Sequence, residues 1–164
     1  MRLLGAALIL SGSLLVYARL LYTRWRERQA LRESIAALEY LSRELSCSLL
    51  PLPRLLERRG LGAYADGLFS QTLALHAADG DMPLADCWRA AAERLPLAAP
   101  EQETLARIAE AFGGTEEGAL AALRGGVSAL RAALAERQHE ERQSGRLAGA
   151  LCLSGGTLLV ILLL

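Results

Sequence analysis

The chain has 164 residues, no net charge at pH 7 and a hydrophobic share of 52%. Its length is that of one ordinary domain, and zero net charge excludes a general attraction to nucleic acid. The three cysteines, at positions 47, 87 and 152, fit no metal-ligand spacing, and a reduced compartment for the middle of the chain is the simplest interpretation.

The first apolar segment, residues 3–22, is predicted to be a transmembrane helix. About 20 helical residues cross the ~30 Å hydrocarbon core, and the one charge in the segment, Arg19, is near enough to its end to reach the interface. A cleaved signal peptide is the alternative, since residues 16–18 resemble a small-residue cleavage site. The arginine-rich sequence that follows argues against export. Aromatic residues, which prefer the headgroup layer, gather at the same end: Tyr17, Tyr22 and Trp25.

The second apolar segment, residues 147–164, carries no charge and is predicted to be another transmembrane helix. Its length is just enough to cross a bilayer, and the alternative, a helix buried in a soluble core, seldom stays so apolar for so long. Gly145 and Gly149 form a GxxxG pattern, a weak indication of helix packing in lipid. Arginines follow the first segment and precede the second, so the positive-inside rule predicts a cytoplasmic domain at residues 23–146 with both termini outside.

This middle region is predicted to be entirely helical, because alanine and leucine dominate and no alternating β-branched run occurs. The first helix should continue from the membrane to Pro51 and Pro53, which end it. Thr115 should cap the last helix, which continues into the second apolar segment. The first helix carries an apolar stripe at Leu31, Ile35, Leu38, Leu41 and Leu45. Shorter helices are expected over 53–59, 63–78, 81–95 (from Asp81 or Met82) and 100–112.

Two features bear on how these helices pack. Trp88 is expected to anchor the core rather than to contact a partner. Gly125 and Gly126 lie inside the last helix and should together cost about 2 kcal/mol relative to alanine. Either that helix bends there or a neighbour approaches closely.

Residues that could carry chemistry form no recognisable site. His139 lies in a charged helical stretch and should be on the surface, whereas His76 should be a partly buried helix residue. A nucleophilic pair of Cys87 and His76 would need a third orienting group. Metal binding by Asp79, Asp81 and Asp86 is an alternative, but Asp79 and Asp81 flank a turn and are expected to cap helix ends. No phosphate-binding loop occurs, so we expect no catalytic, cofactor or metal site and no enzyme.

The order and spacing of several stretches make the chain resemble the stage III sporulation protein AB family over essentially its full length. The most specific stretch is Glu44 followed by "SLLPLP", a glutamate on the long helix and then a proline-containing turn. The other matching stretches are "MRLLGAALILSGSLLVY", "LEYLSRELSCSLLPLPRLLE", "MPLADCWRAA", "FGGTEE" and "RLAGALCLSGGTLLVILLL".

The resemblance implies a fold and a role. The fold class is an all-α antiparallel helical bundle of about six helices, similar to the type II secretion F domain, flanked by N- and C-terminal transmembrane helices. The role is that of a scaffold in the mother-cell membrane, within a channel complex between mother cell and forespore that includes a cytoplasmic secretion-type ATPase. Partners are then other stage III proteins and the lipid bilayer, with no nucleic acid and no cofactor. A membrane-anchored or exported helical regulatory binding module is the alternative. We place the ATPase contact, as a hypothesis, at Glu39, Arg43, Glu44 and Arg54.

Overall fold

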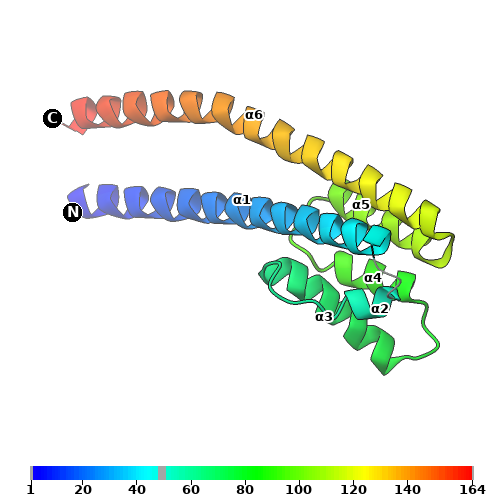
Figure 1. Ribbon diagram of the computed structural model, residues 1–164. Coiled ribbons are helices and arrows are strands. Elements are labelled where there is room, and N and C mark those ends of the chain that lie inside the picture. Colours follow the sequence, from blue (N-terminus) through cyan, green and yellow to red (C-terminus); the bar gives the residue numbers. More distant parts are fainter. Residues whose placement is uncertain (1, 48–50, 164) are drawn as a thin grey trace. The chain divides into compact units, whose positions relative to one another are not determined.

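The computed structural model consists of helices over the backbone that it describes, residues 2–47 and 51–163 (Figure 1). Side chains are described for residues 15, 18–47 and 51–139. No strand occurs in these ranges, which confirms the predicted all-α class. The elements are α1 (Arg2–Cys47), α2 (Leu52–Leu55), α3 (Ala63–Ala78), α4 (Leu84–Ala92), α5 (Ala99–Glu110), the 3₁₀ helix η1 (Ala111–Gly113) and α6 (Glu116–Leu163).

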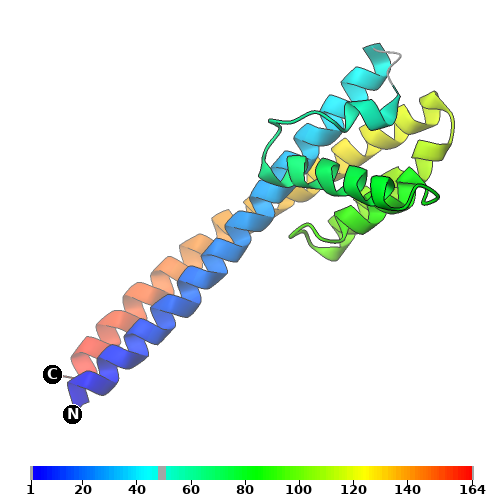
Figure 2. The ribbon, with the colours of Figure 1, turned by 90° about the horizontal axis from the view of Figure 1, so that it is seen from below.

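The chain divides into two compact units, Met1–Leu130 and Arg131–Leu164, with the boundary inside α6. The first unit is a helical bundle, in which α2 and α3 pack on α1, α4 packs on α3, and α5 packs on α4. Helices α2 to α5 gather beside the C-terminal half of α1, and its N-terminal half projects beyond them (Figures 1 and 2). The second unit is the remainder of α6.

The two predicted transmembrane segments are helical in backbone, since α1 and α6 run without a break through residues 3–22 and 147–163. Within the part of the chain whose side chains are described, no helix combines the length and the apolar character needed to span a bilayer. Most of 3–22 and all of 147–164 lie outside that part.

Trp88 is the centre of the bundle core. Its fully buried ring on α4 lies 5.2 Å from Phe112 in an edge-to-face arrangement and 6.1 Å from Phe69 of α3, between ring centroids. The indole Nε1–H donates a hydrogen bond of 3.0 Å to the carbonyl oxygen of Leu105 on α5, so the polar end of the ring is also satisfied. One side chain therefore joins α3, α4, α5 and η1, and its predicted role as a core anchor is confirmed.

The prediction of a two-turn helix over 53–59 was wrong, because α2 ends after a single turn. A tight turn follows it, with a hydrogen bond of 3.2 Å from the Glu57 N–H to the Arg54 carbonyl oxygen. The carboxylate of Asp66 then accepts a hydrogen bond of 2.9 Å from the Gly60 N–H. This carboxylate of α3 therefore holds the loop that connects α2 to α3.

The helix predicted over 81–95 is shorter than expected at both ends. It begins one residue after Pro83, because proline lacks an N–H and disfavours a helical conformation at Met82. It ends at Ala92, where the side-chain amide of Gln102 on α5 donates hydrogen bonds of 3.2 and 3.0 Å to two carbonyl oxygens just beyond the helix. A glutamine of the next helix therefore caps α4.

Other predicted boundaries agree more closely. Helix α3 has the predicted bounds, and the helix predicted over 100–112 divides into α5 and η1. Thr115 caps α6 as predicted, since its Oγ1 accepts a hydrogen bond of 3.2 Å from the Gly118 N–H. Along α1, the stripe residues Leu31, Ile35, Leu38 and Leu41 are buried and Leu45 is half-buried.

Of the two explanations for the paired glycines in α6, close approach is confirmed at Gly126. A Cβ atom there would overlap Ile108 Cδ1 on α5, and it would lie 3.0 Å from Cγ1 of the same residue and 3.5 Å from Leu38 Cδ1 on α1. At Gly125, by contrast, no described heavy atom lies within 4 Å of such a Cβ. Gly126 is therefore a packing requirement, whereas Gly125 faces open space.

We predict opposite effects for Gly126→Ala and Gly125→Ala on the free energy of unfolding. The first should lower it by about 1–3 kcal/mol, because the added methyl group forces buried Ile108 to move. The second should raise it by up to about 1 kcal/mol, since alanine is the better helix former. Denaturant unfolding of the full chain in detergent micelles, followed by the fluorescence of buried Trp88, measures both.

The matched control is the double variant Ile108→Val with Gly126→Ala, because valine lacks the overlapping Cδ1 atom. Its free energy of unfolding should be higher than the sum of the effects of the two single changes implies. Equal effects of alanine at positions 125 and 126 would contradict the close approach.

Candidate partner-binding site

The contact between α1 and the beginning of α3 is a helix cap supplied from another helix. Glu33 of α1 is buried, and its Oε2 accepts hydrogen bonds from the backbone N–H groups of Tyr64 (2.6 Å) and Ala65 (3.4 Å). Its Oε1 accepts a further bond of 2.8 Å from the Gln29 side chain. The carboxylate thus satisfies donors at the positive end of the α3 dipole, which a buried charge requires.

The residue before α3 has to be glycine for two reasons. Gly62 has a φ of 129°, in the region that side chains rarely adopt. A Cβ atom there would also overlap the Glu33 carboxyl group. Since Gly62 has no side chain to cap the helix, the cap comes from α1.

The beginning of α3 is also linked to α1 nearer to the predicted membrane segment. The Arg26 Nε–H donates a hydrogen bond of 3.1 Å to the Tyr64 hydroxyl group, and this bond raises the pKa of Arg26 above its already high ordinary value. The guanidinium carbon of Arg26 lies 5.9 Å from the ring centroid of Tyr22, and the rings of Tyr22 and Trp25 stack with centroids 6.2 Å apart. Both aromatic side chains are more than half exposed.

The four residues predicted to bind a partner do not form one surface. Glu39 and Arg43 are one turn apart and share a face of α1. Glu44 is one turn after Tyr40, and these two residues share a different face of α1. On that face the Arg58 guanidinium carbon lies 5.9 Å from the centroid of the Tyr40 ring. Arg58 lies three residues after the end of α2, so the segment that follows α2 lies against the side of α1 that carries Tyr40.

Of these four residues, Arg43 and Arg54 are exposed, and Glu39 and Glu44 are half-buried. The side chain of Arg54 is 67% exposed and makes an ion pair with Glu57 at 3.4 Å between Nη1 and Oε2. An exposed pair of this kind contributes little to stability. Arg54 can therefore exchange that partner for another carboxylate at small cost.

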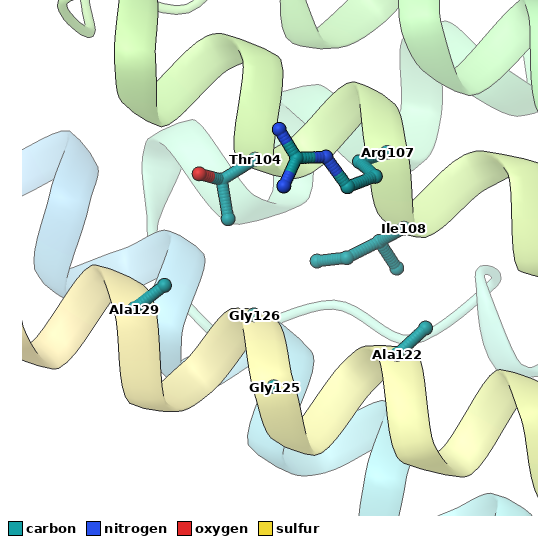
Figure 3. A pocket seen from close by; sticks show the side chains of 7 residues that line it. All are labelled: Thr104, Arg107, Ile108, Ala122, Gly125, Gly126 and Ala129. Carbon is teal, nitrogen blue, oxygen red and sulfur yellow. The ribbon is translucent and has the colours of Figure 1, made fainter.

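A second candidate surface is a groove of about 340 Å³ between α5 and the part of α6 that belongs to the bundle. Figure 3 shows Thr104, Arg107 and Ile108 on the α5 side. The facing wall on α6 consists only of small residues: Ala122, Gly125, Gly126 and Ala129. Side chains this small leave the space between the two helices unfilled.

The residues examined for chemistry have structural partners. Cys87 is fully buried, and burial raises the pKa of its thiol, with further increases from the charges of Asp79 and Asp86, so the reactive thiolate is disfavoured. His76 is half-buried as predicted, with Nδ1 3.2 Å from the Met82 carbonyl oxygen. His139 is exposed, as predicted.

The metal alternative also receives no geometric support. Asp86 is hydrogen-bonded to Arg89 at 2.7 Å, and Asp79 ends α3 through its backbone N–H. Among the described side chains, no three histidine, cysteine, aspartate or glutamate residues come together in a way that could hold a metal ion.

The cap at Glu33 is the feature that the sequence analysis missed. A signal was present, because an acidic residue interrupts the apolar stripe of α1 between Leu31 and Ile35. A second signal was Gly62, which directly precedes a helix without offering a capping side chain. Nothing in the sequence alone indicated that Glu33 and Gly62 lie in contact.

We predict that Glu33→Ala lowers the free energy of unfolding by about 1–3 kcal/mol, because buried N–H groups of α3 lose their acceptor. Glu33→Gln should cost less, since an amide oxygen can still accept the bond from Tyr64. Denaturant unfolding of the full chain in micelles measures both changes.

Glu57→Ala is the matched control, because it removes a glutamate that is exposed and makes an exposed ion pair with Arg54. It should change the free energy of unfolding by less than about 0.5 kcal/mol. A cost for Glu33→Ala no larger than this would refute the cap.

Comparison with known protein families shows that the chain matches the model of stage III sporulation protein AB over residues 2–164. No curated protein and no solved structure matches the chain. The match extends over the helical bundle and both long helices, and it agrees with the resemblance drawn from the sequence stretches above. The chain therefore belongs to the stage III sporulation protein AB family and is a protein of that stage of sporulation.

Proposed function

We propose that this chain is a non-enzymatic membrane platform in a channel complex between mother cell and forespore, and that it docks a cytoplasmic secretion-type ATPase. In this proposal residues 3–22 and 147–164 cross the mother-cell membrane, and residues 23–146 form the cytoplasmic bundle. Family membership supports the stage of sporulation and suggests that other proteins of that stage are partners. The resemblance to this family also implies a similarity to type II secretion F domains, and a platform role would suit that similarity.

The observation that carries the proposal is the distribution of exposed apolar side chains on α1. Leu20, Leu21 and Tyr22 are consecutive and are 54%, 48% and 59% exposed. Successive residues of a helix point about 100° apart, so these side chains cover more than one face of α1. A protein partner on one face would leave the others in water, whereas lipid surrounds the helix.

The ATPase hypothesis divides into two alternatives. The first alternative, Glu44 with Arg54, uses two helices of the bundle that are in contact, and the Arg54 side chain makes an exposed ion pair. The face of Glu39 and Arg43 belongs to α1 alone. We favour the first, because two helices define a more specific surface than one.

A first prediction concerns topology and uses Cys47 as the probe. Cys47 is exposed at the end of α1, whereas Cys87 is buried and should not react in the folded chain. In a Cys152→Ser background, a membrane-impermeant maleimide should label the chain only after the cells are permeabilised.

A variant with one cysteine added after Leu164 is the control, and it should be labelled in intact cells. Labelling of Cys47 in intact cells would contradict a cytoplasmic bundle. A chain whose mass lacks the first eighteen residues would instead favour the alternative of an exported module.

A second prediction concerns ATPase recruitment. Arg54→Glu should reduce the amount of secretion-type ATPase that copurifies with the chain from sporulating cells by about tenfold, since an attractive contact becomes repulsive. Arg107→Glu is the matched variant, because Arg107 is 73% exposed and also forms an exposed ion pair within its helix, at 3.0 Å with Glu103.

These two variants discriminate between the candidate surfaces. A loss with Arg54→Glu alone supports the α1–α2 face, and a loss with Arg107→Glu alone moves the contact to the groove between α5 and α6. Unchanged recruitment in both variants would count against both surfaces.

A further inference from the structure

We propose that α1 carries a binding surface for anionic phospholipid headgroups at the end of the predicted membrane segment and directly after it. This surface, the basic collar, consists of Arg19, Arg24, Arg26, Arg28 and Arg32. The inference rests on the proposed function, because it needs residues 3–22 to cross the bilayer. It adds a lipid class and the residues that recognise it.

The charge of the collar is the first argument. Between residues 19 and 32 five arginines stand against one acidic residue, Glu27. The next acidic residue along the chain, Glu33, is buried and hydrogen-bonded to the N–H groups of α3. The cap therefore withdraws a negative charge that would otherwise weaken the collar, and the surface that remains is strongly basic.

The position of the collar is the second argument, and it favours lipid over an acidic protein or nucleic acid. Tyr22 and Trp25 are exposed, and their stacked rings suit the boundary between hydrocarbon and headgroups. Arg32 is seven residues beyond Trp25, about 10 Å along the helix axis. That distance is close to the thickness of the headgroup layer and to the Debye length at physiological salt. The collar therefore overlaps the phosphate region.

The contact between Arg26 and Tyr64 is the third argument. It holds the guanidinium group beside the Tyr22 ring, at the level where phosphates are expected, and it leaves the two Nη groups of Arg26 for other acceptors. Because Tyr64 is in the first turn of α3, the same contact brings that end of the bundle close to the bilayer surface. Lipid binding by the collar thus also orients the bundle.

The test measures lipid preference of the full chain reconstituted into phosphatidylcholine vesicles. Electron spin resonance of spin-labelled phosphatidylglycerol and phosphatidylcholine gives the ratio of their association constants with the chain. We expect a preference for phosphatidylglycerol at 0.1 M salt that declines at 1 M salt, where the Debye length falls from about 10 Å to about 3 Å.

The double variant Arg24→Gln with Arg32→Gln removes two exposed collar arginines while keeping good helix formers. It should lower the preference at least twofold, because an arginine at an anionic surface contributes up to about fivefold at the lipid it contacts. The matched control, Arg43→Gln with Arg124→Gln, removes the same charge from exposed positions outside the collar and should leave the preference unchanged.

An alkaline carbonate wash distinguishes a failure of the proposed membrane platform from a failure of the collar alone. If the wash extracts the chain from the vesicles, the chain is not integral, and both the proposed membrane platform and the collar are refuted. If the chain is retained without a preference for phosphatidylglycerol, only the collar is refuted. An equal loss of preference in the collar and control variants would likewise overturn it.

Discussion

The bundle depends on one carboxylate that belongs to a different helix from the one it caps. Helix α3 begins after Gly62, whose positive φ allows the entry of the chain but whose missing side chain leaves the first N–H groups without a cap. Glu33 of α1 supplies that acceptor. Because α4 packs on α3 and α5 packs on α4, the cap fixes the first of a series of helices to α1. In the core, Trp88 contacts α3, α5 and η1 and so holds these helices together.

The same interaction has an electrostatic consequence at a distance from the core. A carboxylate within hydrogen-bond reach of backbone N–H groups is held by the helix dipole and no longer faces solvent. Glu33 is therefore enclosed within the fold, while four arginines that precede it on α1 remain exposed and Arg28 is half-buried. Packing and surface charge are coupled here. One residue determines the start of α3 and also the sign of the net charge on the segment beside the predicted membrane helix.

Local signals in the sequence were sufficient for features that depend on one helix. The bounds of α3, the Thr115 cap and the buried stripe of α1 follow from capping chemistry and helical periodicity. Features that depend on contacts between two helices could not be predicted from local signals. The loop after α2 depends on the Asp66 carboxylate of the next helix, which accepts a hydrogen bond from the Gly60 N–H, and the partner of Glu33 lies about thirty residues away. The candidate site could be predicted only in part, since spacing alone separates Glu39 and Arg43 from Glu44, but only the structure places Arg58, three residues after α2, beside Tyr40.

The strengths of the two links between α1 and α3 suggest how a platform of this kind would move. The bond between Arg26 and Tyr64 is exposed, so water can replace either partner at little cost, whereas loss of a buried acceptor such as Glu33 costs more. A force that tilts the bundle against α1 would therefore break the outer bond first and keep the cap intact. In the proposed membrane platform, Glu33 would then be the hinge point, and the Arg26 contact would open and close. Because Arg26 also belongs to the basic collar, a headgroup phosphate bound by its Nη groups would hold the guanidinium group in place beside Tyr64, and tilting of the bundle would be linked to lipid binding.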